Sequence, residues 1–306
     1  MRAFARLAAL GLLLLAMFEP AASAAERLDE KQRIAVVSAF PPEWVALQAD
    51  LSDRAEHEIN GRKFITGKLA GKDVVLFLSG VSMVNAAMTT QSALDQFVVT
   101  SVVFSGIAGG VDPALSIGDV VIADQWGQYL EAVFARKTDS GFEIPAFLPK
   151  DKFAGYGMIV PRSVGIARKG GADEETKFWF PSDPALLDAA RKVAAKLDLL
   201  ACASDNSCLA KPPKIVVGGN GVSGQAFVDN AEFRDYVHKT FDAKVLDMES
   251  AAVAHVTYSN GVPFLAVRSL SDLAGGGEGA NQMATFMALA STNSAHVVKA
   301  LLAEMP

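Results

Sequence analysis

The chain has 306 residues, of which 51% are hydrophobic, and its 28 basic and 34 acidic side chains give a formal net charge of −6. Its length suits one large α/β domain, and its apolar content is enough for a sizeable core. The negative balance argues against nucleic acid and anionic membrane surfaces as partners, because both require a basic face. A small molecule is the partner class that remains.

Residues 1–24 contain the three regions of a secretory signal in order. Arg2 and Arg6 make the start basic, residues 7–18 are an unbroken apolar run, and Ala22-Ser23-Ala24 supplies small residues for a signal peptidase. The run is shorter than the about 20 apolar residues that a membrane span needs. We expect residues 1–24 to be cleaved and residues 25–306 to form one exported domain, periplasmic or secreted, with no membrane contact afterwards. A retained anchor and a cytosolic amphipathic helix are the alternatives.

The rest of the chain alternates apolar strands with amphipathic helices. Strands are predicted at 34–37, 74–78, 98–104, 120–123, 215–217, 244–246 and 264–267. Helices are predicted at 84–97, at 183–199 with Ser182 as N-cap, at 231–241 with Asp229 or Asn230 as cap, and at 251–259 and 282–302. This alternation favours an α/β fold, a mainly parallel central sheet flanked by helices. Segment 136–181, rich in Gly and charged residues, is predicted to be an elaborated excursion.

Two cysteines, Cys202 and Cys208, stand close together in a polar segment. In an oxidising compartment they would close a small disulfide loop, with two free thiols as the alternative. Because the loop is short, we expect the bond to add little to global stability. A metal site is not indicated, since no histidine lies near the cysteines and the histidines show no ligand spacing among themselves (His57, His238, His255 and His296).

Acidic residues follow three of the predicted strands. Glu43 comes after the first, Glu249 after the strand that runs into Asp247, and Asp272 after the last. Ligands of open α/β sheets bind beyond the carboxyl ends of strands, so these acids are expected to face one crevice. Glycosidic cleavage through an oxocarbenium-like state needs such a set, with one acid for the leaving group and another for water. Taken singly, Glu43 or Glu249 is better explained by the dipole of the helix that it opens.

Two glycine-rich segments resemble nucleotide-binding motifs without meeting their requirements. Residues 219–224 fit G-x-G-x-x-G, but no helix is predicted to open at the last glycine. Residues 106–110 form a predicted turn that lacks the Lys and Ser/Thr of a P-loop. We expect this turn to let the backbone of Ala108 and Gly109 approach a ribose or a water molecule. A serine hydrolase of the elbow type is not supported, because G-x-S-x-G does not occur.

Four blocks stand out when they are taken together and in order. They are Gly-Ile-Ala-Gly-Gly at 106–110 with Ile-Gly-Asp-Val-Val at 117–121, Val-Ser-Gly-Gln-Ala-Phe at 222–227, Asp-Met-Glu-Ser-Ala-Ala-Val-Ala at 247–254, and Val-Arg-Ser-Leu-Ser-Asp at 267–272. These blocks resemble the nucleoside phosphorylase/nucleosidase superfamily, most of all its methylthioadenosine/S-adenosylhomocysteine nucleosidase branch. The resemblance covers nearly all of the chain after residue 24. It implies one nucleoside-phosphorylase-like domain, a homodimer, and neither cofactor nor metal.

The resemblance implies a role for each acid. Asp272, held by Ser271, would protonate N7 of the purine. Glu43, assisted by Arg268, would polarise the attacking water, and Glu249 would bind the ribose hydroxyls. An acid at position 272, where relatives acting on 6-oxopurines have Asn, favours adenine-type bases. Further substrate contacts are implied for Met248 on the sugar, for Phe227 and the Val228 backbone at the base, and for Phe40 and Met283 at the 5′ substituent.

The implied reaction is hydrolysis of an adenine-type nucleoside such as methylthioadenosine or S-adenosylhomocysteine. Phosphorolysis is the alternative reaction, but it needs a cationic cradle, and Phe104 stands where the phosphorylases have an arginine. A non-enzymatic nucleoside-binding or storage-like protein is the other alternative, because residues 177–181 and 218–223 also resemble plant bark and vegetative storage proteins. Retention of all three acids argues against it. Ile107, where the nucleosidases commonly have serine, and Phe-Pro-Pro before Glu43 depart from the family pattern.

Overall fold

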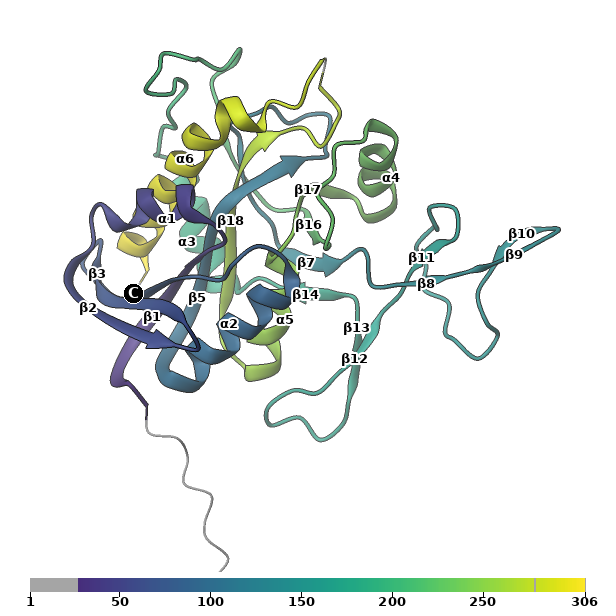
Figure 1. Ribbon diagram of the computed structural model, residues 1–306, viewed down its shortest axis with the longest axis horizontal. Coiled ribbons are helices and arrows are strands. Elements are labelled where there is room, and N and C mark those ends of the chain that lie inside the picture. Colours follow the sequence, from purple (N-terminus) through teal and green to yellow (C-terminus); the bar gives the residue numbers. More distant parts are fainter. Residues whose placement is uncertain (1–26, 278, 306) are drawn as a thin grey trace, which may run out of the picture.

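A 12-stranded sheet forms the centre of the computed structural model, which describes residues 27–277 and 279–305 (Figure 1). The signal expected at 1–24 lies outside these residues. The strands are β1 (Asp29–Ser38), β2 (Ser52–Ile59), β3 (Arg62–Leu69), β4 (Lys72–Leu78), β5 (Phe97–Gly110), β6 (Val120–Ile122), β7 (Gln125–Gln128), β14 (Trp179–Pro181), β15 (Ile215–Val217), β16 (Asn220–Ser223), β17 (Ala243–Asp247) and β18 (Phe264–Asp272). The main path is β14-β7-β16-β17-β5-β1-β4-β3-β2, and β6, β15 and β18 pair off this path.

The middle of the sheet is parallel. There β1 pairs with β4 and β5, and β5 pairs with β18. Antiparallel pairs join β17 to β5, β6 to β18, and β3 to both β2 and β4. The predicted α/β class is confirmed, and the sheet as a whole is mixed, with slightly more parallel than antiparallel strand pairs. Because β1, β5 and β18 run in one direction, their carboxyl ends meet at one edge.

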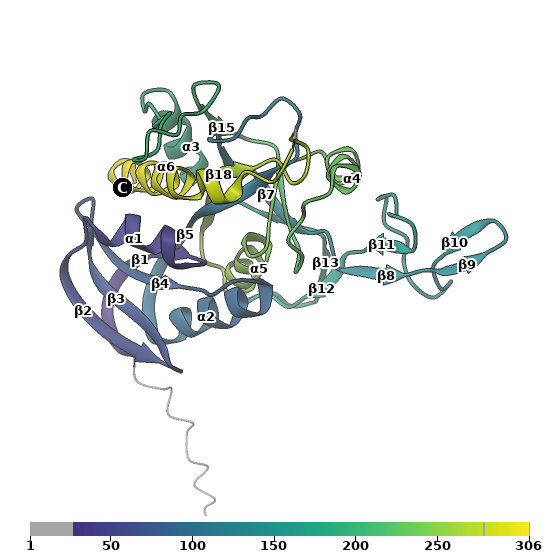
Figure 2. The same ribbon diagram turned by 45° about the horizontal axis from the view of Figure 1, so that its top comes forward.

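Helices cover both faces of the sheet (Figures 1 and 2). On one face, α2 (Met83–Gln96) packs against α5 (Ser250–Asn260). The other face is covered by α1 (Pro41–Gln48), α3 (Pro184–Ala194) and α6 (Met283–Glu304), while α4 (Ala231–Phe241) lies beside β17. In the described part of the chain, no helix combines the length and apolar character that crossing a membrane requires.

Neighbouring residues of a strand serve the two cores in turn. In β4, Val75 and Phe77 belong to the core beneath α2 and α5, whereas Val74 and Leu76 belong to the core beneath α1, α3 and α6. Successive side chains of a strand point to opposite faces of the sheet. A strand covered on both faces is therefore apolar without interruption, which is the pattern that predicted the central strands.

The glycine-rich segment 106–110 is the end of β5, and its prediction as a turn is wrong. Its backbone pairs with β18 and with β17. A Cβ atom at Gly110 would lie 2.8 Å from Leu270 Cδ1 and 3.1 Å from Leu273 Cδ2. Here glycine permits close packing against a neighbouring strand rather than a change of chain direction.

The antiparallel hairpin of β2 and β3 was not predicted. β2 is mostly exposed, so it lacks the apolar alternation on which strand prediction depends. The turn between the strands contains Asn60 and Gly61, with φ of 51° and 72°. Positive φ at both central residues is what a type I′ hairpin turn requires, and Asn-Gly is its strongest sequence signal.

Two helix starts test the predicted caps. Asn230 caps α4 by accepting a hydrogen bond from the N–H of Phe233, as one of the two predicted alternatives. The expected cap at Ser182 is wrong, because Asp183 accepts the N–H groups at the start of α3. The Ser182 hydroxyl donates instead to the carbonyl of Ala123. Both residues are typical caps, and the register of the helix decides between them.

Most of the excursion predicted at 136–181 belongs to an arm of short strands that spans residues 132–177. Its ribbons pair β8 (Ala132–Phe134) with β11 (Ile159–Pro161), β9 (Arg136–Thr138) with β10 (Gly141–Glu143), and β12 (Val164–Ile166) with β13 (Glu175–Lys177). Both ribbon views show β8 to β11 projecting away from the sheet (Figures 1 and 2). The chain returns to the sheet at β14, which pairs antiparallel with β7.

The predicted disulfide between Cys202 and Cys208 is present and joins residues six positions apart. Other contacts hold the surrounding segment. Before the disulfide, Leu200 and Asn293 exchange two hydrogen bonds of 2.9 Å. After it, the N–H of Lys214 donates to Asp119 Oδ1 at 2.9 Å. The disulfide therefore closes a short loop that is anchored independently at both ends.

Candidate active site

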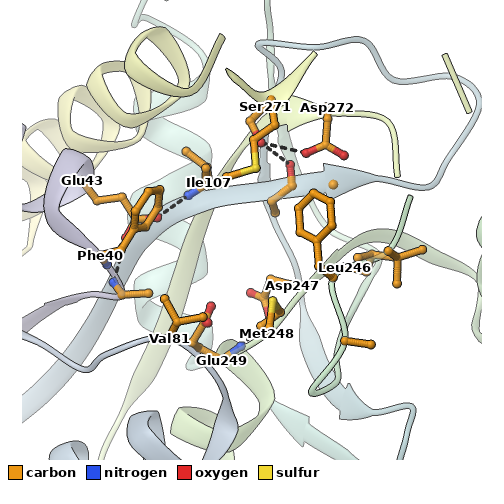
Figure 3. Close-up of a pocket in the computed structure, with 17 residues that line it drawn as sticks. Phe40, Glu43, Val81, Ile107, Leu246, Asp247, Met248, Glu249, Ser271 and Asp272 are labelled. Atoms are coloured by element: carbon orange, nitrogen blue, oxygen red, sulfur yellow. Dashed lines mark hydrogen bonds between the residues drawn. The ribbon is translucent and has the colours of Figure 1, made fainter. Parts of the chain in front are cut away.

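A cavity of about 180 Å³ lies at the carboxyl ends of β1, β5, β17 and β18 (Figure 3). All predicted site residues except Arg268 line it, namely Phe40, Glu43, Ala108, Gly109, Phe227, Val228, Met248, Glu249, Ser271, Asp272 and Met283. The other lining residues were not predicted from the sequence and are Ala39, Val81, Ile107, Ala226, Leu246 and Asp247. Figure 3 shows Glu43 and Asp272 on opposite sides of the cavity.

Glu43 is fixed by three backbone N–H groups. Those of Ala39 and Phe40 donate to Oε2 at 2.7 and 3.3 Å, and that of Ile107 donates to Oε1 at 2.8 Å. Burial raises the pKa of Glu43, while the charge of Arg268 and these hydrogen bonds lower it. Because the N–H of Ile107 belongs to β5, Glu43 is held by a contact outside its own helix. The dipole of α1 alone therefore does not explain why an acid stands at this position.

Arg268 is fully buried and lies behind the cavity wall. Its Nε is 2.7 Å from Asp247 Oδ2 and donates to Ser250 Oγ at 2.9 Å. Nη2 donates to Glu249 Oε2 at 3.4 Å, and Nη1 donates to the carbonyl of Ile107 at 3.2 Å. The guanidinium thus contacts the carboxylates of Asp247 and Glu249 directly and acts on Glu43 through its charge.

Gly106 permits the approach of Arg268 to Glu43. A Cβ atom at position 106 would lie 2.2 Å from Arg268 Nη1 and 2.7 Å from Glu43 Oε1. Any side chain here would push the two charged groups apart or force β5 to move. Arg268 and Glu43 can therefore lie this close together because residue 106 is a glycine.

Glu249 sits where several charges meet. Its Oε1 accepts the N–H of Ser82 at 2.9 Å. Burial raises the pKa of Glu249 to about 7, and the negative charges of Asp247 and Glu43 add to this, against the lowering by Arg268 and the Ser82 N–H. The carboxyl group therefore changes its charge near neutral pH.

Asp247 links the end of β17 to β16 and to the start of α5, a role that was not predicted from the sequence. Its Oδ1 accepts the N–H groups of Glu249 and Ser250 at 3.1 Å each, and it also accepts the hydroxyl of Ser223 from β16. Oδ2 faces Arg268. An Asp shortly before a helix is a capping signal, and that signal was available in the sequence.

Asp272 ends β18 and is 3% exposed. Ser271 Oγ donates to Oδ2 at 2.9 Å, as the resemblance implied, and the N–H of Ala274 donates to Oδ1 at 2.8 Å. Burial raises the pKa of Asp272, with a further contribution from the charge of Asp229, while the hydrogen bonds from Ala274 and Ser271 lower it. The acid therefore keeps its proton to a higher pH than an exposed Asp.

Apolar side chains fill the wall between the carboxyl groups: Phe40, Val81, Ile107, Phe227, Val228, Leu246, Met248 and Met283. Phe227 is 58% exposed and presents its ring at the opening. An apolar cavity with a few polar groups that fix orientation is typical of small-molecule sites. Across residues 27–277 and 279–305, no three His, Cys, Asp or Glu side chains are grouped to hold a metal ion.

The raised pKa of Glu249 makes stability depend on pH. The pKa of Glu249 is about 7 in the folded protein, above its ordinary value of 4.5. The folded state therefore gains stability from the protonated group below about pH 4.5 and loses it as pH rises through about 7. Glu249→Gln cannot ionise, so we expect its free energy of unfolding to rise relative to wild type between about pH 5 and about pH 8. Urea titrations at both pH values measure this difference.

The control for this experiment is Glu232→Gln, which changes an exposed residue in the first turn of α4. Its difference from wild type should stay constant between the two pH values. If the Glu249→Gln difference is equally constant, the carboxyl group does not titrate in this range and the prediction is wrong.

Known proteins similar to this chain agree with the fold and with the sequence blocks. A family model described as the phosphorylase superfamily matches residues 33–303. A 5′-methylthioadenosine/S-adenosylhomocysteine nucleosidase of Tolumonas auensis is 30% identical over 274 residues, which cover 89% of this chain and 100% of that protein. A nucleosidase of the same name from Geobacillus thermodenitrificans is 31% identical over 272 residues, covering 88% and 96%.

A solved structure leads to the same family. The 5′-methylthioadenosine/S-adenosylhomocysteine nucleosidase of Neisseria meningitidis, crystallised with methylthio-immucillin-A, matches with a TM-score of 0.67 at 26% identity, over 90% of this chain and 100% of that one. The family model spans nearly all of the described residues. The chain therefore belongs to the phosphorylase superfamily, whose nucleoside phosphorylases and nucleosidases act on N-glycosidic bonds.

Proposed function

We propose that this protein hydrolyses the N-glycosidic bond of an adenine-type nucleoside, such as methylthioadenosine or S-adenosylhomocysteine, and releases the base. The observation that carries the proposal is the meeting of Glu43, Glu249 and Asp272 in one apolar cavity, each with a raised pKa. Acids with perturbed pKa values that share a cavity are typical of acid–base catalysis.

The positions of the acids suit separate roles. Asp272 donates its proton to N7 of the base as the bond between C1′ and N9 breaks, and the bonding electron pair goes to the base. Glu43, on the opposite side, orients a water molecule and takes its proton as the oxygen bonds to C1′. Glu249 accepts hydrogen bonds from the ribose hydroxyls. Its neighbour Met248 packs against the sugar.

The rest of the wall supports the choice of substrate. The Phe227 ring stacks on the base, and the Val228 backbone contacts its polar edge. Phe40 and Met283 provide apolar contacts for a thioether at the 5′ position. Nucleosidases that share 30% and 31% identity with this chain are named for methylthioadenosine and S-adenosylhomocysteine, which supports the same substrate class here.

Water rather than phosphate is the proposed nucleophile. No Lys or Arg is among the described residues that line the cavity. Arg268 is engaged behind the wall by Asp247 and Glu249, and the Phe104 ring lies 4.2 Å from its guanidinium. An anion such as phosphate would meet the Glu43 carboxylate without a compensating cation.

Asp272→Asn tests the proposed acid. The amide keeps the size of the side chain but cannot give up a proton, so kcat should fall by about 10²–10⁴-fold, while adenine binding is largely retained. Adenine release from methylthioadenosine and calorimetric binding of adenine measure the two effects separately.

Asp188→Asn serves as its control, because Asp188 is an exposed residue of α3 that pairs only with Arg191. This variant should match wild type in both assays. Near-wild-type turnover of Asp272→Asn would remove Asp272 from the mechanism.

The nucleophile is identified from the products. Methylthioadenosine, S-adenosylhomocysteine, adenosine and inosine are incubated with the protein, with and without phosphate. We expect free 5-thioribose derivatives at a rate that phosphate does not change, and little cleavage of inosine. Formation of a ribose 1-phosphate derivative, with a rate that saturates in phosphate, would instead establish phosphorolysis.

We also propose that the protein is exported and acts as a homodimer. Protein recovered from the periplasm should begin near residue 25, and its cysteines should not react with an alkylating reagent after denaturation without reductant. Intact mass analysis reads both properties, and light scattering of the same sample gives the oligomer mass. A chain that retains Met1, or two alkylated thiols, would contradict export into an oxidising compartment.

A further inference from the structure

Asp272 lines a second, smaller cavity of about 40 Å³ as well as the main one. Among the described residues that line it, the polar side chains are those of Asp229, Asp272, Asn281 and Gln282, and glycines after β18 supply much of the remaining wall. A water molecule needs about 10–15 Å³ and two or more polar partners, and this cavity provides both. Asp272 therefore lies between a site for a ligand and a site for water.

Asn281 connects the two carboxyl groups of this second cavity. Its Nδ2 donates to Asp229 Oδ1 at 3.0 Å, and its Oδ1 accepts the N–H of Met283 at 2.9 Å. The backbone bond fixes the orientation of the amide, so its NH2 group faces the acids. Asn281 also lies close enough to Asp272 to lower its pKa, and Asp229 is close enough for its charge to raise it.

The backbone holds Asp229 in this position. The N–H of Asn230 donates to the carbonyl of Ala274 at 3.1 Å. Gly275 has a φ of +86°, and a Cβ atom there would lie 2.3 Å from the Asn230 nitrogen. The loop that leaves Asp272 is thus pressed against the start of α4, and Asp229 cannot move away without breaking this contact.

The proposed hydrolysis requires a proton supply at Asp272. In each turnover Asp272 loses a proton to the base, and Glu43 gains one from the attacking water. Asp272 must then gain a proton and Glu43 must lose one. The two lie on opposite sides of the main cavity, which the products still fill, and Asp272 is 3% exposed. Asp229, by contrast, is exposed to solvent.

We propose, on the basis of the proposed function, that Asp229 passes protons from solvent through water in the second cavity to Asp272. Asp229 takes a proton from solvent and gives it to this water, which gives one to Asp272, and no other bond changes. Asn281 holds the two carboxyl groups in line for this transfer. Asp229 acts through Asp272 and does not touch the substrate.

Asp229→Asn tests the relay, because the amide oxygen still accepts the bond from Asn281 but the side chain no longer carries a proton. With enzyme in excess, the first turnover uses the proton already on Asp272 and should proceed at the wild-type rate. Under multiple turnover, kcat should fall about tenfold, less than the 10²–10⁴-fold loss expected on removing the acid itself. Raising the concentration of imidazole buffer at constant pH and ionic strength should restore kcat.

Asp235→Asn is the matched control, since Asp235 is an exposed acid of α4 that does not line the cavity and pairs with Lys239. It should behave as wild type in every assay. Equal losses in first and later turnovers of Asp229→Asn, without a buffer effect, would show a structural role and overturn the relay. Unchanged kinetics would also overturn it. Absence of cleavage by the wild type would instead refute the proposed function itself.

Discussion

The buried guanidinium of Arg268 is the group on which the arrangement of the site depends. It contacts Asp247 and Glu249 directly and acts on Glu43 through charge. Burying charges costs several kcal/mol for each ion unless partners and hydrogen bonds offset it. One cation faces three carboxyl groups, so its compensation is incomplete. Burial keeps the pKa of Glu43 raised, and burial together with the charges of Asp247 and Glu43 raises the pKa of Glu249 to about 7. The interaction that holds the site together therefore also sets its protonation.

Strand register makes this interaction possible. In the parallel pairing of β18 with β5, Arg268 stands opposite Gly106. Because glycine has no Cβ, the guanidinium passes over β5 and reaches the carbonyl of Ile107, whose N–H holds Glu43. A one-residue shift of β18 would place its charge on the other face of the sheet. The central sheet thus positions the charges of the site as well as forming the core.

The two acids on opposite sides of the main cavity have different surroundings. Glu43 is held by backbone N–H groups and lies close to the buried cation. Asp272 has a hydroxyl and one N–H for partners, and the carboxyl group of Asp229 lies near it. Buried acids with different partners can take opposite roles in proton transfer. Most of the wall between them is apolar.

The central strands, the acids that follow them and the disulfide were determined by the sequence alone, because their patterns lie within short stretches of the chain. Uninterrupted apolar runs identified the central strands, because burial on both faces requires them, and the acids after those strands were expected at one edge because parallel strands end together. The close pair Cys202 and Cys208 likewise predicted its own disulfide. The hairpin of β2 and β3 and the capping by Asp247 had local signals that were not used in the prediction. The end of β5 and the cap of α3 were decided by tertiary structure, because the first depends on distant strands and the second on the register of the helix. The second cavity is the clearest case, since Asp229 and Asp272 stand far apart along the chain and are brought together by the packing of the loop after β18 against the start of α4.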